Sequence, residues 1–157
     1  MINVRIVCVG KLKEKYLKEG IDEYLKRLQR FCKTEIIEVA EELCLDPSPS
    51  NLIKVKSAEG ERIIKNLKGY CISLDLKGQM LSSEELSAKI SSLKSDGVST
   101  VSFVIGGSYG LDKSVTSKCD MSICFGKFTY PHQLMRLMLA EQIYRCFMIK
   151  EGSAYHK

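Results

Sequence analysis

The feature that most constrains this chain is a regular alternation of strand-like and helix-like segments. Short runs rich in apolar and β-branched residues lie at residues 2–9, 34–39, 70–76, 100–105 and 120–125. Between them, apolar residues recur at the three- and four-residue spacing that gives a helix one apolar face. Strands that alternate with helices form βαβ units around a parallel sheet. The sequence therefore predicts an α/β fold of three layers with a mostly parallel sheet.

Local signals place the helices and their ends. Ser82 and Glu85 have the spacing of a capping box, Asp112 is a candidate helix cap, and Pro131 suits a first helical turn. Helices are expected at residues 16–31, 52–67, 82–96 and 131–150, with a short one near residue 111. No repeat or boundary interrupts the chain, so residues 1–157 are predicted to form one domain. Periodicity alone favours an open, flavodoxin-like sheet.

Composition excludes several classes of protein. No run approaches the roughly 20 apolar residues that span a bilayer, and Arg5 interrupts the apolar start, so neither a membrane span nor a signal peptide is expected. The seven cysteines are odd in number and lack C-x-x-C spacing, which favours free thiols in the cytoplasm. The two histidines, His132 and His156, have no cysteine at zinc-finger spacing, so no metal site is expected.

Charge is unevenly spread along the chain. The net charge is +5, with basic blocks at residues 11–33, 54–68 and 127–157 and an acidic stretch at residues 35–46. Separate basic blocks suit a polyanionic partner, because neutralised phosphates release counterions. Charged helices of mixed sign are also ordinary solvated faces, so charge alone leaves both interpretations open.

Three glycine-containing loops follow predicted strands, at residues 74–78, 105–110 and 125–130. Ligands of open parallel sheets bind beyond the carboxyl ends of the strands, and glycine lets backbone groups approach them closely. The loops together favour a pocket for a nucleoside-like cofactor, although glycines can also simply turn the chain. The G-x-G-x-x-G, P-loop and G-x-S-x-G motifs are absent, which argues against a dinucleotide enzyme, a P-loop NTPase and a serine hydrolase.

The last predicted helix is apolar on most faces, yet it carries several polar and charged residues. Glu141 and Arg145 are four residues apart and can pair with each other. His132 and Arg136 share one face next to the loop at 125–130, which makes them site candidates or parts of a subunit interface. The chain ends in Tyr-His-Lys at residues 155–157, a combination suited to stacking on a base and contacting phosphate.

Six motifs, in order along the chain, resemble the ribosomal RNA large subunit methyltransferase H family of the SPOUT superfamily. They are VGKLKEKY, KxxEGERI, LDLKGxxLSSEE, FVIGGSYG, FGKFTYPHQLMRLMLAEQIYR and the terminal AYHK. The resemblance covers essentially the whole chain. It implies a deep trefoil knot in the C-terminal third, a homodimer, and S-adenosylmethionine bound in the knot. It also implies methylation of N3 of a pseudouridine in 23S rRNA on the assembled ribosome.

The resemblance also implies where the site residues lie. The cofactor-binding positions fall on Leu74, Gly106, Phe125, Gly126, Lys127, Phe128, Thr129 and Tyr130, within the three loops. The family's tail motif falls on Tyr155, His156 and Lys157.

Removal of the N3 proton from the acceptor base calls for a base or a stabilising cation. We assign His156 as candidate base, Arg136 as a substrate-orienting residue and Tyr155 as a residue that stacks on or positions the base. His132 and Lys157 are assigned to substrate binding, with shaping of the loop at 125–130 as the alternative role for His132. A small chain without an RNA-binding domain is expected to complete its active site with the partner protomer. Two other hypotheses are a non-catalytic, cofactor-binding dimer on the ribosome and a methyltransferase for small molecules.

Overall fold

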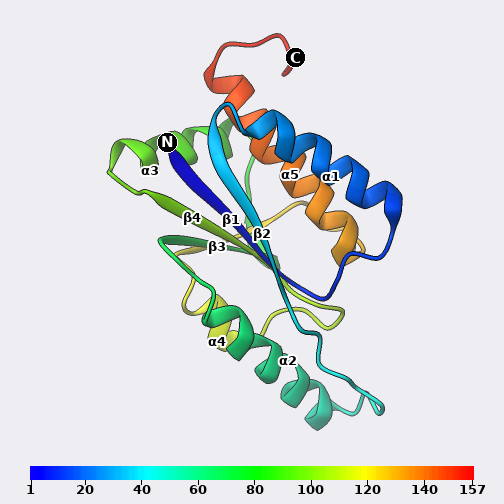
Figure 1. Cartoon of the computed structure of the whole chain (residues 1–157). Helices are drawn as coiled ribbons and strands as arrows, with labels where there is room; N and C mark the ends of the chain where they lie inside the picture. The colour runs from blue at the N-terminus through cyan, green and yellow to red at the C-terminus, as the bar shows by residue number, and fades with distance from the viewer.

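The computed structural model describes all 157 residues and contains one five-stranded sheet with helices on both faces (Figure 1). All strand pairs are parallel, and the order across the sheet is β2-β1-β4-β3-β5. The strands are β1 (Ile2–Val9), β2 (Cys32–Val39), β3 (Tyr70–Met80), β4 (Thr100–Ile105) and β5 (Met121–Cys124). The predicted α/β class and parallel sheet are therefore confirmed.

The helices form two layers, one on each face of the sheet. They are α1 (Lys15–Leu28), α2 (Pro49–Ile64), α3 (Ser83–Ser95), α4 (Lys113–Thr116) and α5 (His132–Lys150). Helices α1, α3 and α5 cover one face, and α2 and α4 cover the other (Figure 1). The three predicted layers are confirmed, and none of the helices is both long and apolar enough to cross a membrane.

Strand β1 is at the centre of the core because both of its faces are apolar. Ile6 and Cys8 pack with the layer of α1, α3 and α5, whereas Val7 and Val9 pack with α2 and α4. Successive side chains of a strand point to opposite faces, so this near-continuous apolar run serves two cores at once. Arg5 is accommodated because its Nε lies 2.7 Å from Oε1 of Glu35, its register partner on β2.

The order of the strands differs from the flavodoxin-like arrangement that periodicity favours. In that arrangement β3 would lie beside β1, but here β4 lies between them. Strand β3 runs to Met80, beyond the predicted end at residue 76, and its register against β5 shifts between Leu74 and Gln79. A Cβ atom at Gly78 would lie 2.6 Å from the carbonyl carbon of Ile123, so only glycine permits this close approach.

The predicted helix caps are confirmed. At the start of α3 the Glu85 N–H donates to Ser82 Oγ at 3.1 Å, and the Ser82 N–H donates to Glu85 Oε2 at 2.7 Å. Asp112 caps α4 by accepting from the Ser114 N–H at 2.9 Å. Helix α2 begins at Pro49, earlier than predicted, because proline's fixed φ and missing N–H suit a first helical turn. All seven cysteines are free.

Candidate functional site

The three loops predicted to bind a ligand meet around one cavity of about 720 Å³. The cavity lies beyond the carboxyl ends of β3, β4 and β5, because parallel strands end at the same edge of the sheet. The predicted cofactor-binding residues that line it are Leu74, Gly106, Phe125, Gly126, Phe128, Thr129 and Tyr130. Lys127 belongs to the same loop but is exposed and does not line the cavity.

The loop at residues 106–110, called the glycine loop below, forms one wall of this cavity. It folds back on itself, with the Gly110 N–H donating to the Gly107 carbonyl at 3.1 Å. A Cβ atom at Gly106 would lie 2.9 Å from the Gly110 carbonyl carbon, so a larger residue would open the turn. The wall is therefore mostly backbone, which offers N–H and C=O groups to a polar ligand.

Three lysines that the sequence analysis did not single out for the site also line the cavity: Lys56 from α2, Lys77 from β3 and Lys113 from α4. None of them forms a salt bridge. Lys77 lies within the loop at residues 74–78, and Lys113 follows the loop at residues 105–110 by three residues, so both lie near sequence signals for the site. Lys56 lies far from these loops in sequence, and only the packing of α2 brings it to the cavity.

His132 and Arg136, which share one face of α5, have different surroundings. His132 lines the cavity, and burial together with the nearby Arg136 charge lowers its pKa, so the neutral imidazole is favoured. Arg136 is 1% exposed, and Nη2 donates to the carbonyls of Gly10 at 2.7 Å and Val9 at 3.0 Å. Its Nη1 lies 2.7 Å from Glu38 Oε2. Arg136 thus ties α5 to the ends of β1 and β2 and does not line the cavity, and the substrate-orienting role expected from the sequence stays a prediction.

The C-terminal residues 155–157, called the tail below, lie at the other end of α5. Helix α5 has 19 residues and is therefore about 28 Å long, with His132 at its start and the tail beyond its end (Figure 1). The Tyr155 hydroxyl donates to Glu141 Oε1 at 3.1 Å, and the Arg145 guanidinium lies 4.9 Å from the centre of the Tyr155 ring. One chain therefore does not bring its own tail and cavity together.

His156 is held by two charged side chains. Its Nε2 lies 2.7 Å from Glu84 Oε1, and its Nδ1 lies 3.3 Å from Arg145 Nη1. A guanidinium can only donate, so Nδ1 accepts and Nε2–H donates to Glu84. Arg145 also pairs with Glu141 at 2.5 Å, which confirms the predicted i, i+4 pair. In this arrangement both ring nitrogens are engaged, so His156 must exchange a partner before it can accept a proton.

A second, mostly apolar cavity of about 640 Å³ lies between α1, α5 and the loop that follows β5. Gly20 and Tyr24 contribute from α1, and Leu137 and Met138 contribute from α5. Phe125 and Gly126 line both cavities. A partner seated in the second cavity would therefore contact the loop that lines the first.

Comparisons with known proteins give the family. The family model described as "Predicted SPOUT methyltransferase" matches residues 2–156. The ribosomal RNA large subunit methyltransferase H of Pediococcus pentosaceus is 54% identical over 159 residues, covering 99% of this chain and all of that protein. The protein of the same name from Alkaliphilus oremlandii is 53% identical over 163 residues, with 99% of this chain and all of that protein covered.

Among solved structures, a probable methylase family protein from Haemophilus influenzae Rd KW20 has a TM-score of 0.55. It is 13% identical, and the match covers 99% of this chain and 71% of that one, which shows a shared fold alone. The C-terminal trefoil knot expected from the sequence is implied by the family that the model match identifies. The parallel sheet, the cavity at the ends of β3, β4 and β5, and the full-length matches agree, and the chain belongs to the SPOUT methyltransferase family.

Proposed function

We propose that this protein transfers a methyl group from S-adenosylmethionine to N3 of a pseudouridine in 23S rRNA on the assembled ribosome. The observation that carries the proposal is the backbone-lined cavity at three adjacent strand ends, in a chain of the SPOUT methyltransferase family. The full-length relatives named ribosomal RNA large subunit methyltransferase H support rRNA as the substrate. An rRNA substrate in turn favours the cytoplasm as the place of action.

The residues present fit S-adenosylmethionine. Side chains such as Leu74 and Met135 offer apolar walls to the adenine, and the glycine loop offers backbone groups to its polar edge. The cavity volume of about 720 Å³ is within the usual range for ligands of this size. Leu74, Gly106 and residues 125–130 would hold the cofactor. When bound, S-adenosylmethionine supplies a methyl group activated by a sulfonium.

The chain's own residues then bind and orient the acceptor base. His132 lines the cavity and, in its neutral form, offers one donor and one acceptor to the substrate. Tyr155 offers a ring for stacking, Lys157 offers a charge for phosphate, and His156 remains our candidate for the base that takes the N3 proton. Arg136 acts as a positioning residue because it fixes the start of α5, where His132 lies.

The separation of tail and cavity supports a composite active site in a homodimer. The length of α5, about 28 Å, separates the tail from the cavity of the same chain. The apolar cavity between α1 and α5 suits a second copy of this chain, because its exposed apolar wall gains stability when covered. In such a dimer, the tail of one protomer would serve the cavity of its partner.

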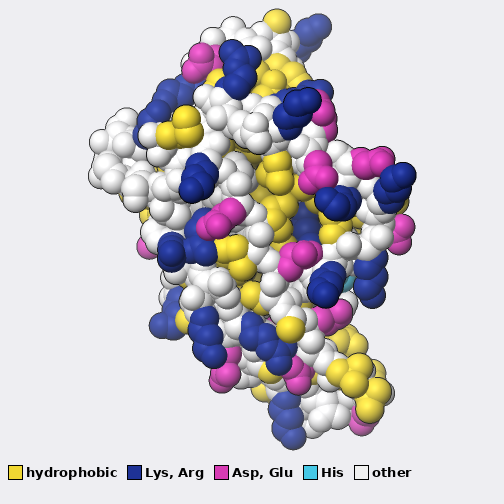
Figure 2. All heavy atoms as spheres, in the orientation of Figure 1, with side chains coloured by type: hydrophobic (Ala, Val, Ile, Leu, Met, Phe, Trp, Pro, Cys, Tyr) yellow, Lys and Arg dark blue, Asp and Glu magenta, His cyan; other side chains and the backbone are white.

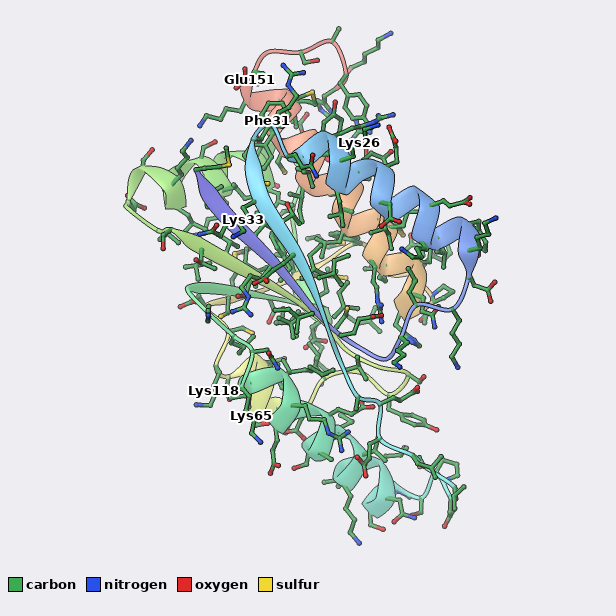
Figure 3. All side chains as sticks on the ribbon, viewed as in Figure 1. Lys26, Phe31, Lys33, Lys65, Lys118 and Glu151 are labelled. Atoms are coloured by element: carbon green, nitrogen blue, oxygen red, sulfur yellow. The ribbon has the colours of Figure 1, made fainter.

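Basic side chains support contact with rRNA phosphates. Lys56, Lys77 and Lys113 line the catalytic cavity without a carboxylate partner. Figure 2 shows Lys and Arg side chains spread over the face in view, with acidic side chains among them. Figure 3 shows Lys26 on α1 and Lys65 at the end of α2, so basic side chains project from both helical layers. Such contacts position RNA and make binding dependent on salt.

The proposal is tested by incubating the purified protein with methyl-labelled S-adenosylmethionine and ribosomes from cells that lack this methylation. Free 23S rRNA is assayed in parallel. Label that maps to N3 of a pseudouridine in the ribosomal sample, and not in free rRNA, is the expected result. Cofactor binding and ribosome binding without any transfer would instead identify a non-catalytic, ribosome-associated dimer. Transfer to a small molecule without RNA would refute rRNA as the acceptor.

A further inference from the structure

Glu59 is a buried acidic residue that the proposed mechanism does not use. It lies in the middle of α2, within the KxxEGERI motif, and is 3% exposed. Its Oε2 accepts a hydrogen bond from the Glu42 N–H at 3.1 Å, while Oε1 is buried and has no hydrogen-bond partner. A buried polar atom without a partner costs free energy, so this carboxyl calls for an explanation.

The unpartnered oxygen lies directly behind the glycine loop. A Cβ atom added at Gly107 would be 3.0 Å from Oε1 of Glu59 and 3.1 Å from Cγ1 of Val9. The loop backbone therefore lies close to the carboxyl, and a side chain at residue 107 would have to displace Glu59 or Val9 slightly. The loop residues, Gly107 included, also line the cavity.

The residue after Glu59 extends the same contact. A Cβ atom at Gly60 would lie 3.2 Å from Cγ2 of Val115 and 3.3 Å from Cβ of Asp112, the residue that caps α4. Two consecutive residues of α2, Glu59 and Gly60, thus pack against the glycine loop and the start of α4, respectively. Glu59 itself is not among the cavity-lining residues, so it can affect a ligand only through the loop.

The surroundings of Glu59 raise the pKa of its carboxyl above the ordinary value. Burial is the main cause that raises this pKa, the hydrogen bond from the Glu42 N–H lowers it, and the carboxylates of Glu41 and Glu42 raise it further. Arg62 on the same helix opposes them, but its guanidinium is paired with Glu42 and also donates to the Ala40 carbonyl.

We propose that Glu59 is a positioning residue that holds the glycine loop in the conformation that receives S-adenosylmethionine. The inference rests on the proposed function, since it assigns the cofactor to this cavity. Glu59 accepts a hydrogen bond from the Glu42 N–H and fills the space against which Gly107 packs. Glutamine reproduces both in the same volume, whereas alanine removes both and leaves a void behind Gly107.

The test measures the Kd of S-adenosylmethionine by calorimetry for the wild type and three variants. Glu59→Gln is expected to bind within about twofold of wild type, and Glu59→Ala to bind about tenfold more weakly, which equals about 1.4 kcal/mol. Glu61→Ala, an exposed acid on the same helix, is the matched control and should bind as wild type. With ribosomes, Glu59→Ala should raise KM for the cofactor and leave kcat at saturation unchanged. The inference would be overturned if Glu59→Ala bound the cofactor with the wild-type Kd, or if Glu59→Gln weakened binding as much as Glu59→Ala.

A second pair of variants covers the case in which Glu59→Ala does not fold. Gly107→Ala adds a methyl group against the carboxyl and should also weaken cofactor binding. In the Glu59→Gln background, Gly107→Ala should weaken cofactor binding as much as it does in the wild type, because the side chain behind residue 107 keeps its size. In the Glu59→Ala background, the same change should weaken cofactor binding less than in the wild type. Equal costs in all backgrounds, or no cost at Gly107, would contradict the contact. A wild type that binds cofactor but methylates nothing refutes the proposed function only; a wild type that binds no cofactor overturns both.

Discussion

Replacing Arg136 by methionine should destabilise the protein strongly, because the structure makes this side chain part of the scaffold. Methionine keeps much of the length of arginine but removes all its donors. The change leaves the carbonyls of Val9 and Gly10 without the Arg136 donor and Glu38 without its ion-pair partner. These groups lie where α5 crosses the ends of β1 and β2, next to the wall that carries His132.

The magnitude follows from the three hydrogen bonds at 2.7, 2.7 and 3.0 Å. A hydrogen bond to a charged group contributes about 1.5 kcal/mol or more, which gives about 4–5 kcal/mol for three. The Glu38 side chain is 38% exposed, so water replaces part of its lost bond and this sum is an upper value. We therefore expect the free energy of unfolding to fall by about 4 kcal/mol, a large share of the roughly 5–15 kcal/mol typical of a domain.

Urea denaturation at fixed protomer concentration measures this loss, since subunit association would otherwise contribute. With a slope of about 2 kcal/mol per molar urea, the midpoint should fall by about 2 M. Lys18→Met, which breaks an exposed pair with Asp22, is the control and should cost no more than about 0.5 kcal/mol. An Arg136→Met protein that keeps wild-type stability but loses methyl transfer would refute the scaffold role and restore the substrate-orienting one.

Three further predictions concern the substrate, the dimer and pH. The double variant Lys56→Ala, Lys113→Ala should bind ribosomes more weakly, and the slope of log K against log salt concentration should become shallower by about 2. Binding titrations from low to high salt measure this slope, and an unchanged slope would exclude phosphate contacts by these two lysines. Mixing His156→Ala with Gly106→Val protomers should restore about a quarter of wild-type activity if each site combines the tail of one chain with the cavity of the other. Half of the mixed dimers are then heterodimers, and each heterodimer holds one intact site of two. No recovery after subunit exchange would show that the tail and the cavity of one site come from the same chain. Burial raises the pKa of Glu38, but the hydrogen bonds from Arg136 and the Leu12 N–H outweigh it, so the pKa is lowered in the folded protein. The Glu38 carboxylate therefore stabilises the fold above its ordinary pKa near 4.5, and this stabilisation is lost as the pH falls through the lowered pKa. The stability difference between wild type and Glu38→Gln should accordingly shrink in acid, and a constant difference would contradict the ion pair.

The local elements could be predicted because their causes lie within a few residues of sequence. The capping box of Ser82 and Glu85 and the Asp112 cap are each decided by side chains that reach backbone groups two or three residues away. The apolar run of β1 announces burial on both faces, and the structure buries it in two cores. The glycine loops were recognisable for the same reason, since strand ends and glycines are both local signals.

Contacts between distant segments could not be predicted in this way. Arg136 and His132 are one helical turn apart, and only the position of β1 decides that one is buried in the scaffold while the other lines the cavity. Glu59 belongs to a motif that the sequence displays, but nothing nearby in the chain shows that its carboxyl lies behind Gly107. Glu59 and Gly107 are 48 residues apart in the sequence, and only the tertiary fold brings them together.

The amino-acid sequence by itself determined the α/β class, the parallel sheet, the loops that line the cavity and, through its motifs, the family. Those properties depend on periodicity, caps and turns, which act over short stretches of chain. Tertiary structure alone decided the strand order, in which β4 separates β1 from β3, and the distance between the tail and the cavity at opposite ends of α5. The strand order and this distance depend on which apolar faces pack against each other in the folded chain. Many strand orders are compatible with the same local pattern of strands and helices, so the pattern alone cannot select one.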